Sequence, residues 1–271
     1  MRNEQGRKRI RSVVETSAIV LLCVLTVALD FLEISYVKDG FRNRMIGKTV
    51  QQACGTTAAI LLMLRLDVRL FGKPRKLWYI LPCLLVAIDN FQFSAYFNGK
   101  MSLDRTSPLD FILFFGYCMA VGLFEECIFR GVIFSVLAGC FSKDKKGVLK
   151  TYFLSAVIFG VAHLLNGFSL GTLLQVVYTV LTGGLFAFCL MKTKNILCCA
   201  FVHGLYNFCG LLFDTQGLGT GVVFDVGTVV TMAIVGVCVG IFVLYSVFRY
   251  SEEERRTLYG YLGLKTDKNE E

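Results

Sequence analysis

Charged residues, prolines and histidines are all scarce in this chain of 271 residues. Charged side chains make up 18% of it, and there are only 3 prolines and 2 histidines. A soluble domain of this length carries more charge, so the composition excludes an ordinary soluble protein. Apolar runs of about 20 residues recur along almost the whole chain instead, which is typical of an all-α, polytopic helical membrane protein.

Paired cysteine motifs are absent as well. The 11 cysteines are scattered through apolar segments, with no C-x-x-C pair and no zinc-ribbon spacing, so most are expected to be small buried hydrophobic side chains. Cys127 differs in following an acidic pair, which places it near a candidate site. The net charge of +8 comes from segments between apolar runs. No nucleic-acid partner is therefore predicted; the partner of these basic segments is the lipid bilayer.

The apolar runs predict about eight transmembrane helices packed as one bundle. The predicted spans are 14–36, 49–64, 77–97, 109–139, 151–168, 170–190, 195–213 and 222–248. The fourth has 31 residues, about 46 Å of helix, so it must tilt, break or project into water. The predicted domains are a basic cytosolic N-terminus (1–13), a single transmembrane catalytic domain (14–248) and a charged cytosolic C-terminal tail (249–271). The charged run SEEERR (251–256) is expected to end the last helix.

The distribution of basic residues predicts the orientation. With the N-terminus in the cytosol and an uncleaved first span, 21 Lys and Arg residues fall on the cytosolic side and 6 on the other. This asymmetry favours both termini inside. The segment 37–48 is expected to be a loop on the non-cytosolic side. Its basic residues run against the rule that Lys and Arg gather on the cytosolic side.

Both histidines and an acidic pair lie inside these apolar runs. Ionisable groups are costly in hydrocarbon and by default mark a functional site. The three segments are FEECIFRG (124–131), IFGVAHLLNG (158–167) and FVHGLYNF (201–208). Counted from the cytosolic ends of their spans, Glu125, His163, His203 and Asn207 lie at similar depths of about 12–21 Å. We therefore expect these groups to meet in one site.

The spacing within each segment indicates which side chains share a helix face. Glu126 and Arg130 are four apart, as suits an ion pair, and Glu125 points about 100° away. Phe159 and His163 are also four apart, with Asn166 three further on. His203 and Asn207 are four apart, and Gly204 allows a close approach of another helix or a substrate backbone. The alternative is that the charged groups only pair with one another and specify packing.

These residue types fit the activation of water. A buried glutamate beside an imidazole is a usable general base. A His–Asn pair on one face can donate hydrogen bonds to a developing oxyanion. Together they are the parts of a hydrolase without a serine or cysteine nucleophile.

Other polar residues within spans have two interpretations each. Asp89 either pairs with another helix or lines a cavity. The set Gln175, Tyr178 and Thr182 is expected to form interhelical hydrogen bonds, with lining of a substrate path as the alternative. Gly183 and Gly184 indicate close helix packing.

The three motifs, in order and on successive spans, resemble those of the CAAX protease and bacteriocin-processing (CPBP, or Abi) family of intramembrane endopeptidases. The resemblance covers about 109–213 and is carried by E-E-x-x-x-R, F-x-x-x-H and H-x-x-x-N. It implies a CAAX-prenyl-protease-like bundle in which Glu125 is the base and His163 orients the water. His203 and Asn207 would stabilise the oxyanion. Glu126 and Arg130 would hold the fourth span, with Phe159 and Asn166 also supporting the site.

The resemblance leaves two possibilities for a cofactor. We favour no required metal. The alternative is a divalent metal such as zinc, held by Glu125, His163 and His203 with a free fourth position.

The sequence thus predicts an intramembrane endopeptidase that uses glutamate- and histidine-activated water. Its expected substrate is a membrane-associated peptide precursor or lipidated protein, and its expected location is a bacterial cytoplasmic membrane. One alternative is a non-catalytic membrane scaffold or regulatory partner of the self-immunity type. A second is a proton-coupled transporter. The oligomeric state is not predicted.

Overall fold

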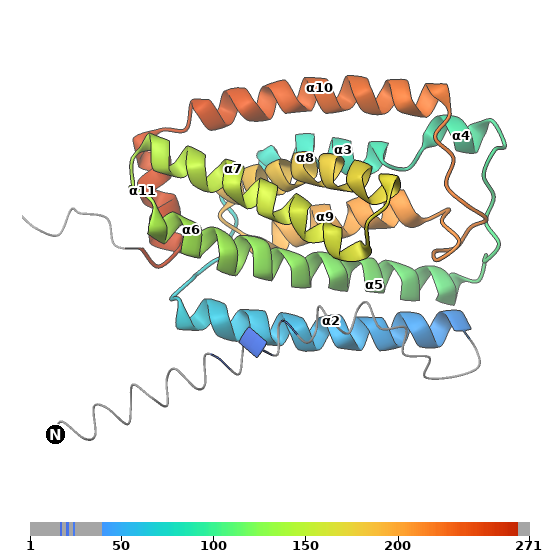
Figure 1. The fold of residues 1–271 in the computed structure, drawn as a ribbon, viewed down its shortest axis with the longest axis horizontal. Coiled ribbons are helices and arrows are strands. Elements are labelled where there is room, and N and C mark those ends of the chain that lie inside the picture. Colours follow the sequence, from blue (N-terminus) through green and yellow to red (C-terminus); the bar gives the residue numbers. More distant parts are fainter. Residues whose placement is uncertain (1–16, 18–19, 22–23, 25–39, 265–271) are drawn as a thin grey trace, which may run out of the picture.

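The computed structural model describes residues 40–264, together with residues 17, 20, 21 and 24 of the preceding segment. These residues form an all-α bundle, and no strand occurs among them beyond one isolated bridge between Leu103 and Gly219. Helices α2 (Gly40–Arg65) and α10 (Val226–Phe248) lie along opposite sides of the bundle (Figure 1). Between them lie α3 (Ile80–Asp89), α5 (Pro108–Glu126), α7 (Lys145–Ala162), α8 (Leu170–Thr193) and α9 (Ile196–Leu211).

Among the described residues, four helical segments are long and apolar enough to cross a membrane. They are Pro108–Cys140, Lys145–Asn166, Leu170–Thr193 and Val226–Phe248, and two shorter apolar helices, Leu77–Asp89 and Ile196–Leu211, accompany them. The polytopic all-α fold is therefore confirmed, whereas the count of eight spans stays a prediction. The first predicted span, 14–36, lies outside the continuously described residues, as does the segment 1–13.

The long fourth span is continuous but not uniform. After α5 the chain winds into the π-helix η2 (Cys127–Ile133) and then into α6 (Phe134–Cys140). A π-helix carries its hydrogen bonds one residue further along the chain than an α-helix does, and such segments are frequent at functional sites. The expected break is thus a local widening of the helix, placed directly after Glu126.

Helix α2 corrects the expected outer loop at 37–48, because it begins at Gly40 and includes most of that segment. Ion pairing explains the difference. Arg42 Nε lies 2.6 Å from Asp110 Oδ1 at the start of α5, and Arg44 donates to the carbonyl of Gln216. Phe41 and Met45 are buried against the bundle. These basic residues therefore belong to a packed helix end.

The predicted span 77–97 is also wrong as one helix. It comprises the 3₁₀ turn η1 (Leu77–Tyr79), α3 and the short α4 (Phe93–Phe97). Asn90 donates its side-chain amide to the carbonyl of Tyr206 in α9 at 2.9 Å, and Gln92 has a left-handed φ of 58°. These two residues end α3 and reverse the chain.

The charged run 251–256 begins a new helix, which corrects its expected place at the end of the last span. Ser251 and Glu254 form a reciprocal capping box at the start of α11 (Glu252–Tyr261). Leu258 and Tyr259 of α11 are buried in the main core. The backbone N–H of Arg69 donates to Tyr261 O, and that of Ile196 donates to Leu70 O. Loops expected on the cytosolic side thus meet at the α11 end of the bundle; which side of the membrane this is stays a prediction.

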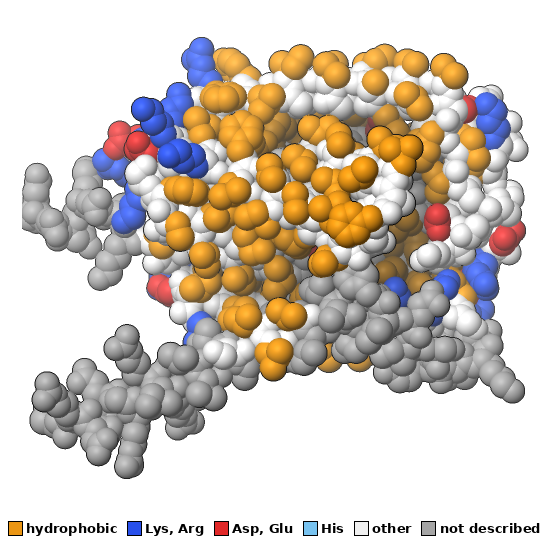
Figure 2. All heavy atoms as spheres, viewed as in Figure 1, with side chains coloured by type: hydrophobic (Ala, Val, Ile, Leu, Met, Phe, Trp, Pro, Cys, Tyr) orange, Lys and Arg blue, Asp and Glu red, His pale blue; other side chains and the backbone are white. Residues whose placement is uncertain are grey.

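The outer surface of the bundle is apolar along its length. Large hydrophobic side chains on α8 and α10 are exposed, among them Leu174, Leu181, Val237 and Ile241. Figure 2 shows hydrophobic side chains spread over the middle of one face, with Lys and Arg gathered near α11. A soluble monomer rarely exposes so large an apolar area, whereas a membrane protein presents it to lipid.

Candidate active site

Two facing glycines set the spacing between α5 and α9. A Cβ atom on Gly122 would lie 2.6 Å from the Gly204 backbone nitrogen and 2.7 Å from the Ala200 carbonyl oxygen. A Cβ on Gly204 would lie within 3 Å of Met119. The two backbones therefore approach more closely than any other residue type allows, as small residues permit between membrane helices. One turn after Gly122, this contact brings Glu126 against His203.

Glu126 joins Arg130 and His203 in a buried cluster. Its Oε1 lies 2.9 Å from His203 Nδ1, and its Oε2 lies 3.2 Å from Arg130 Nε. The side chains of Glu126 and Arg130 have no exposed surface, and that of His203 has 5%. Because a carboxylate oxygen accepts, Nδ1 of His203 carries the proton of this hydrogen bond. Only Nε2 is left to face reacting atoms.

Glu125 faces the free nitrogen of the same ring. Its Oε2 lies 3.7 Å from His203 Nε2, and its side chain is 26% exposed. That oxygen is itself buried and has no hydrogen-bond partner among the described residues. His203 is thus placed between two carboxylates, one sealed and one partly open, and Glu125 has an oxygen available for a water or a substrate.

His163 approaches from the other side of Phe159. It opens the 3₁₀ turn η3 (His163–Asn166) at the end of α7, and its Nδ1 lies 2.9 Å from the Phe159 carbonyl oxygen. Because a carbonyl oxygen accepts, Nδ1–H of His163 is the donor, and Nε2 is the ring nitrogen left for another partner. The Phe159 ring makes edge contacts with both imidazoles, at 5.1 Å from His163 and 5.6 Å from His203 between ring centroids. Phe159 therefore separates and orients the two rings.

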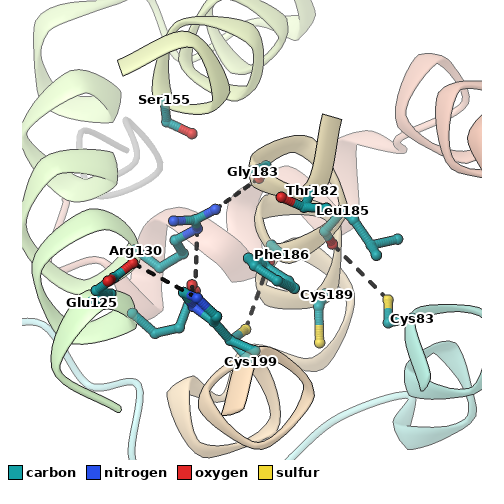
Figure 3. A network of polar contacts seen from close by, with 12 residues as sticks. Cys83, Glu125, Arg130, Ser155, Thr182, Gly183, Leu185, Phe186, Cys189 and Cys199 are labelled. Carbon is teal, nitrogen blue, oxygen red and sulfur yellow. Dashed lines mark hydrogen bonds and ion pairs between the residues drawn. The ribbon is translucent and has the colours of Figure 1, made fainter. Parts of the chain in front are cut away.

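Helix α8 completes the cluster, which the sequence did not reveal. Arg130 reaches from η2 to donate to the Gly183 carbonyl at 2.9 Å (Figure 3). Its guanidinium lies 4.3 Å from the centroid of the Phe159 ring and 5.5 Å from that of Phe186. Phe186 stacks on His203, with centroids 4.5 Å apart and planes 20° from parallel. The one available signal was Gly183–Gly184, which indicated close packing but not a role at the site.

The remaining candidate residues are not part of the cluster formed by Glu126, Arg130 and His203. Asn207 shares a helix face with His203 and is half-buried, but its side chain forms no hydrogen bond with another described residue. Asn166 is exposed and donates to Gln175 Oε1 at 3.1 Å. Cys127 is buried in the main core rather than open to the site. Asp89 lies beside Thr231 of α10, which favours the helix-pairing interpretation.

No group of three or more His, Cys, Asp or Glu side chains in the described part of the chain is arranged to hold a metal ion. His203 uses Nδ1 for Glu126, and His163 uses Nδ1 for a carbonyl. These hydrogen bonds leave Nε2 of each ring as the nitrogen for a further partner, as in histidines that bind a metal. The ligand set of Glu125, His163 and His203 therefore stays an alternative, and no step below depends on a metal.

The arrangement can bind and polarise water. One partly open carboxylate, two imidazoles anchored through Nδ1 and a nearby carboxamide provide a base, two groups that can orient or stabilise, and a hydrogen-bond donor. The buried Glu126–Arg130 pair and the aromatic rings hold these groups in place.

Comparison with known families agrees with these motifs. Residues 107–209 match the family of type II CAAX prenyl endopeptidase Rce1-like proteins, which confirms the family resemblance over that range. The match contains Glu125, Glu126, Arg130, Phe159, His163, His203 and Asn207. No curated protein and no solved structure matches the chain. The four apolar helices of the described residues and this Rce1-like domain support an integral membrane protein.

Proposed function

With an Rce1-like domain at residues 107–209 as the starting point, we propose that this protein is an intramembrane endopeptidase acting through water activated by glutamate and histidine. Family membership supports endopeptidase activity in general; the mechanism and the residue roles are the proposal. The observation that carries it is the placement of His203 between Glu126 and Glu125, at 2.9 Å and 3.7 Å. The oxygen of Glu125 that faces this ring has no protein hydrogen bond.

In the proposed reaction, Glu125 removes a proton from water as the oxygen attacks the scissile carbonyl. His163 Nε2 accepts the second hydrogen of that water and orients it. The tetrahedral oxyanion receives hydrogen bonds from the Asn207 amide and from Nε2–H of His203. Because Nδ1–H of His203 is donated to Glu126, this step uses the doubly protonated form of the ring. Glu125 then passes its proton to the leaving amine as the C–N bond breaks, so the products are a carboxylic acid and an amine.

The other site residues hold this geometry. Glu126 fixes the ring of His203, and Arg130 balances the charge of Glu126 while joining η2 to α8. Phe159 and Phe186 confine the imidazole planes. Asn166, exposed and bonded to Gln175, supports the turn that carries His163.

We propose a membrane-associated substrate, either a prenylated protein tail or a hydrophobic peptide precursor, in line with the description of the matched family. We also propose a bacterial cytoplasmic membrane with both termini in the cytosol, a single catalytic domain within 14–248, and no required cofactor. The charged groups of the site lie inside apolar helices, so the scissile bond must reach membrane depth.

The direct test uses the purified full chain in lipid nanodiscs with a farnesylated peptide ending in a CAAX sequence. We expect cleavage by the wild type and a loss of about 10³-fold or more in Glu125→Gln, because the base is removed. Glu253→Gln, an exposed glutamate on α11, is the matched control and should keep full activity. EDTA should leave the wild-type rate unchanged.

A comparison of membrane peptidomes extends this test to the natural substrate. Cells with the intact protein should contain a truncated peptide that cells with Glu125→Gln lack. Equal peptidomes, together with a biological effect that survives Glu125→Gln at normal expression, would replace the protease proposal with the non-catalytic scaffold.

A further inference from the structure

A run of polar side chains lies along the apolar helix α8 and leads to the site. No Asp, Glu, Lys or Arg occurs between Thr151 and Met191. Within this stretch, Gln175, Thr179, Thr182 and Phe186 follow one another at spacings of four, three and four, so they share one face of α8. Phe186 stacks on His203, which places the end of this face at the catalytic cluster.

The other end of the face is continued by polar side chains that lie close together. Asn166, three residues after His163, donates to Gln175 Oε1 at 3.1 Å. The Tyr178 hydroxyl lies near the Gln175 side chain. We call Asn166, Gln175, Tyr178, Thr179 and Thr182 the polar stripe. It connects the turn of one catalytic histidine to the helix face that supports the other.

The polar stripe is open at one end and closed at the other. Thr179 and Thr182 are buried, whereas Tyr178 is 45% exposed and Asn166 is exposed. Around them α8 presents Leu174, Val177 and Leu181 to the outside. Polar groups that face hydrocarbon are costly and are retained where they serve a pathway or a partner. The exposure of Tyr178 therefore indicates a ligand that runs along α8 toward the site.

We propose that the polar stripe binds the extended backbone of the peptide substrate beside the scissile bond, an inference that rests on the proposed endopeptidase function. A peptide in hydrocarbon must have every N–H and C=O group paired, and an extended segment cannot pair them internally. The carboxamides of Asn166 and Gln175 each offer a donor and an acceptor, and the Tyr178 hydroxyl offers both. The stripe is uncharged, as suits a neutral backbone rather than an ionic ligand.

The test measures binding separately from cleavage. In a Glu125→Gln background, binding of a fluorescent farnesylated peptide to nanodiscs gives a Kd without turnover. Gln175→Leu and Tyr178→Phe should each raise this Kd about 3–10-fold, the effect of one lost hydrogen bond. Tyr245→Phe is the matched control, since Tyr245 is 59% exposed on α10, and it should leave the Kd unchanged.

A series of peptides with single esters in place of amides locates the contact. An ester lacks the N–H donor, so one position should weaken wild-type binding and have no further effect in Gln175→Leu or Tyr178→Phe. An unchanged Kd in both variants, an equal loss in Tyr245→Phe, or additive ester effects at every position would overturn the proposal. Absence of peptide binding in the Glu125→Gln background would overturn it as well. The two proposals can also separate. If Gln175→Leu and Tyr178→Phe weaken peptide binding but the protein with Glu125 intact cleaves no peptide, the role of the polar stripe is upheld and the protease function is refuted.

Discussion

Two clusters in this bundle have the same bonding scheme in different surroundings. In the site, Glu126 joins Arg130 and His203, and all three side chains are buried. At the α11 end, Glu254 Oε1 joins Lys76 at 2.7 Å and Lys192 at 3.0 Å, with the Lys76 side chain half exposed. The first ties α5, η2 and α9 together at membrane depth, whereas the second ties α8 to α11 near water. The same ion pairs should therefore carry catalysis in one place and only modest stability in the other.

The largest effect on stability and activity is expected from Glu126→Gln. Loss of this carboxylate leaves Arg130 buried without a counter-charge, which typically costs about 3–5 kcal/mol. It also misorients His203, so we expect a loss of about 100-fold or more in kcat for the farnesylated peptide. Thermal unfolding in nanodiscs and the cleavage assay measure the two effects.

A double variant separates them. Glu126→Gln with Arg130→Met removes both charges and should recover most of the stability, because neither charge is left alone. Activity should stay low, since His203 still lacks its acceptor. A double variant with wild-type kcat would show that Glu126 acts only as a counter-charge.

An intermediate effect is expected from Lys194, which lies beside the Glu254 cluster. Burial lowers the pKa of Lys194 to about 7. The negative charge of Glu254 partly opposes this shift. Neighbouring positive charges add to it, those of Lys192, Lys76 and Arg75. The unfolded chain keeps this lysine protonated up to pH of about 10.4, so between pH 7 and 10 it binds more protons than the folded state. Stability should rise by about 2 kcal/mol from pH 7 to pH 9.

Lys194→Met tests this dependence. The variant should lose the rise in melting temperature between pH 7 and pH 9 and should keep its peptidase activity. Lys143→Met, at the same end of the bundle but in an exposed loop, should keep the wild-type pH profile. A profile that is unchanged in Lys194→Met would mean that the lysine is charged in the folded protein.

The smallest effect is expected from Glu254→Gln. Hydrogen bonds from Lys76 and Lys192, and from the Ser251 backbone, lower the pKa of Glu254 to about 2 against the opposing effect of burial. Its contribution is therefore complete above pH of about 4.5 and is lost as the pH falls toward 2. We expect Glu254→Gln to cost about 1–2 kcal/mol at pH 7, with activity within twofold of wild type. The difference in melting temperature from wild type should shrink below pH 4, and a constant difference would contradict the assignment.

The sequence predicted the all-α membrane fold and the family motifs because both depend on local patterns. Apolar length identifies a span, and a spacing of four identifies Glu126–Arg130 as a pair. The start of α2 was missed because its neutralising partner, Asp110, is 68 residues away. The turn after α3 depends on the carbonyl of Tyr206, 116 residues from Asn90.

The site shows the same limit. The spacing within the motifs predicted Glu125, His163 and His203 as site residues. It could not show that the carboxylates of Glu126 and Glu125 would both face the His203 ring. Phe186 carries no local signal at all, since phenylalanine is common in this chain, with 24 copies. Its importance comes only from its stack on His203, a contact between helices.

The π-helix at Cys127–Ile133 holds one residue more than regular winding would. Removal of a single residue there would convert the stretch to an α-helix, and the flanking helices α5 and α6 would keep their orientation relative to each other. Only the side chains inside the stretch would shift, so Arg130 would lose its donation to the Gly183 carbonyl. We therefore expect a single-codon deletion in this stretch to preserve the fold and to disrupt the buried cluster around Glu126.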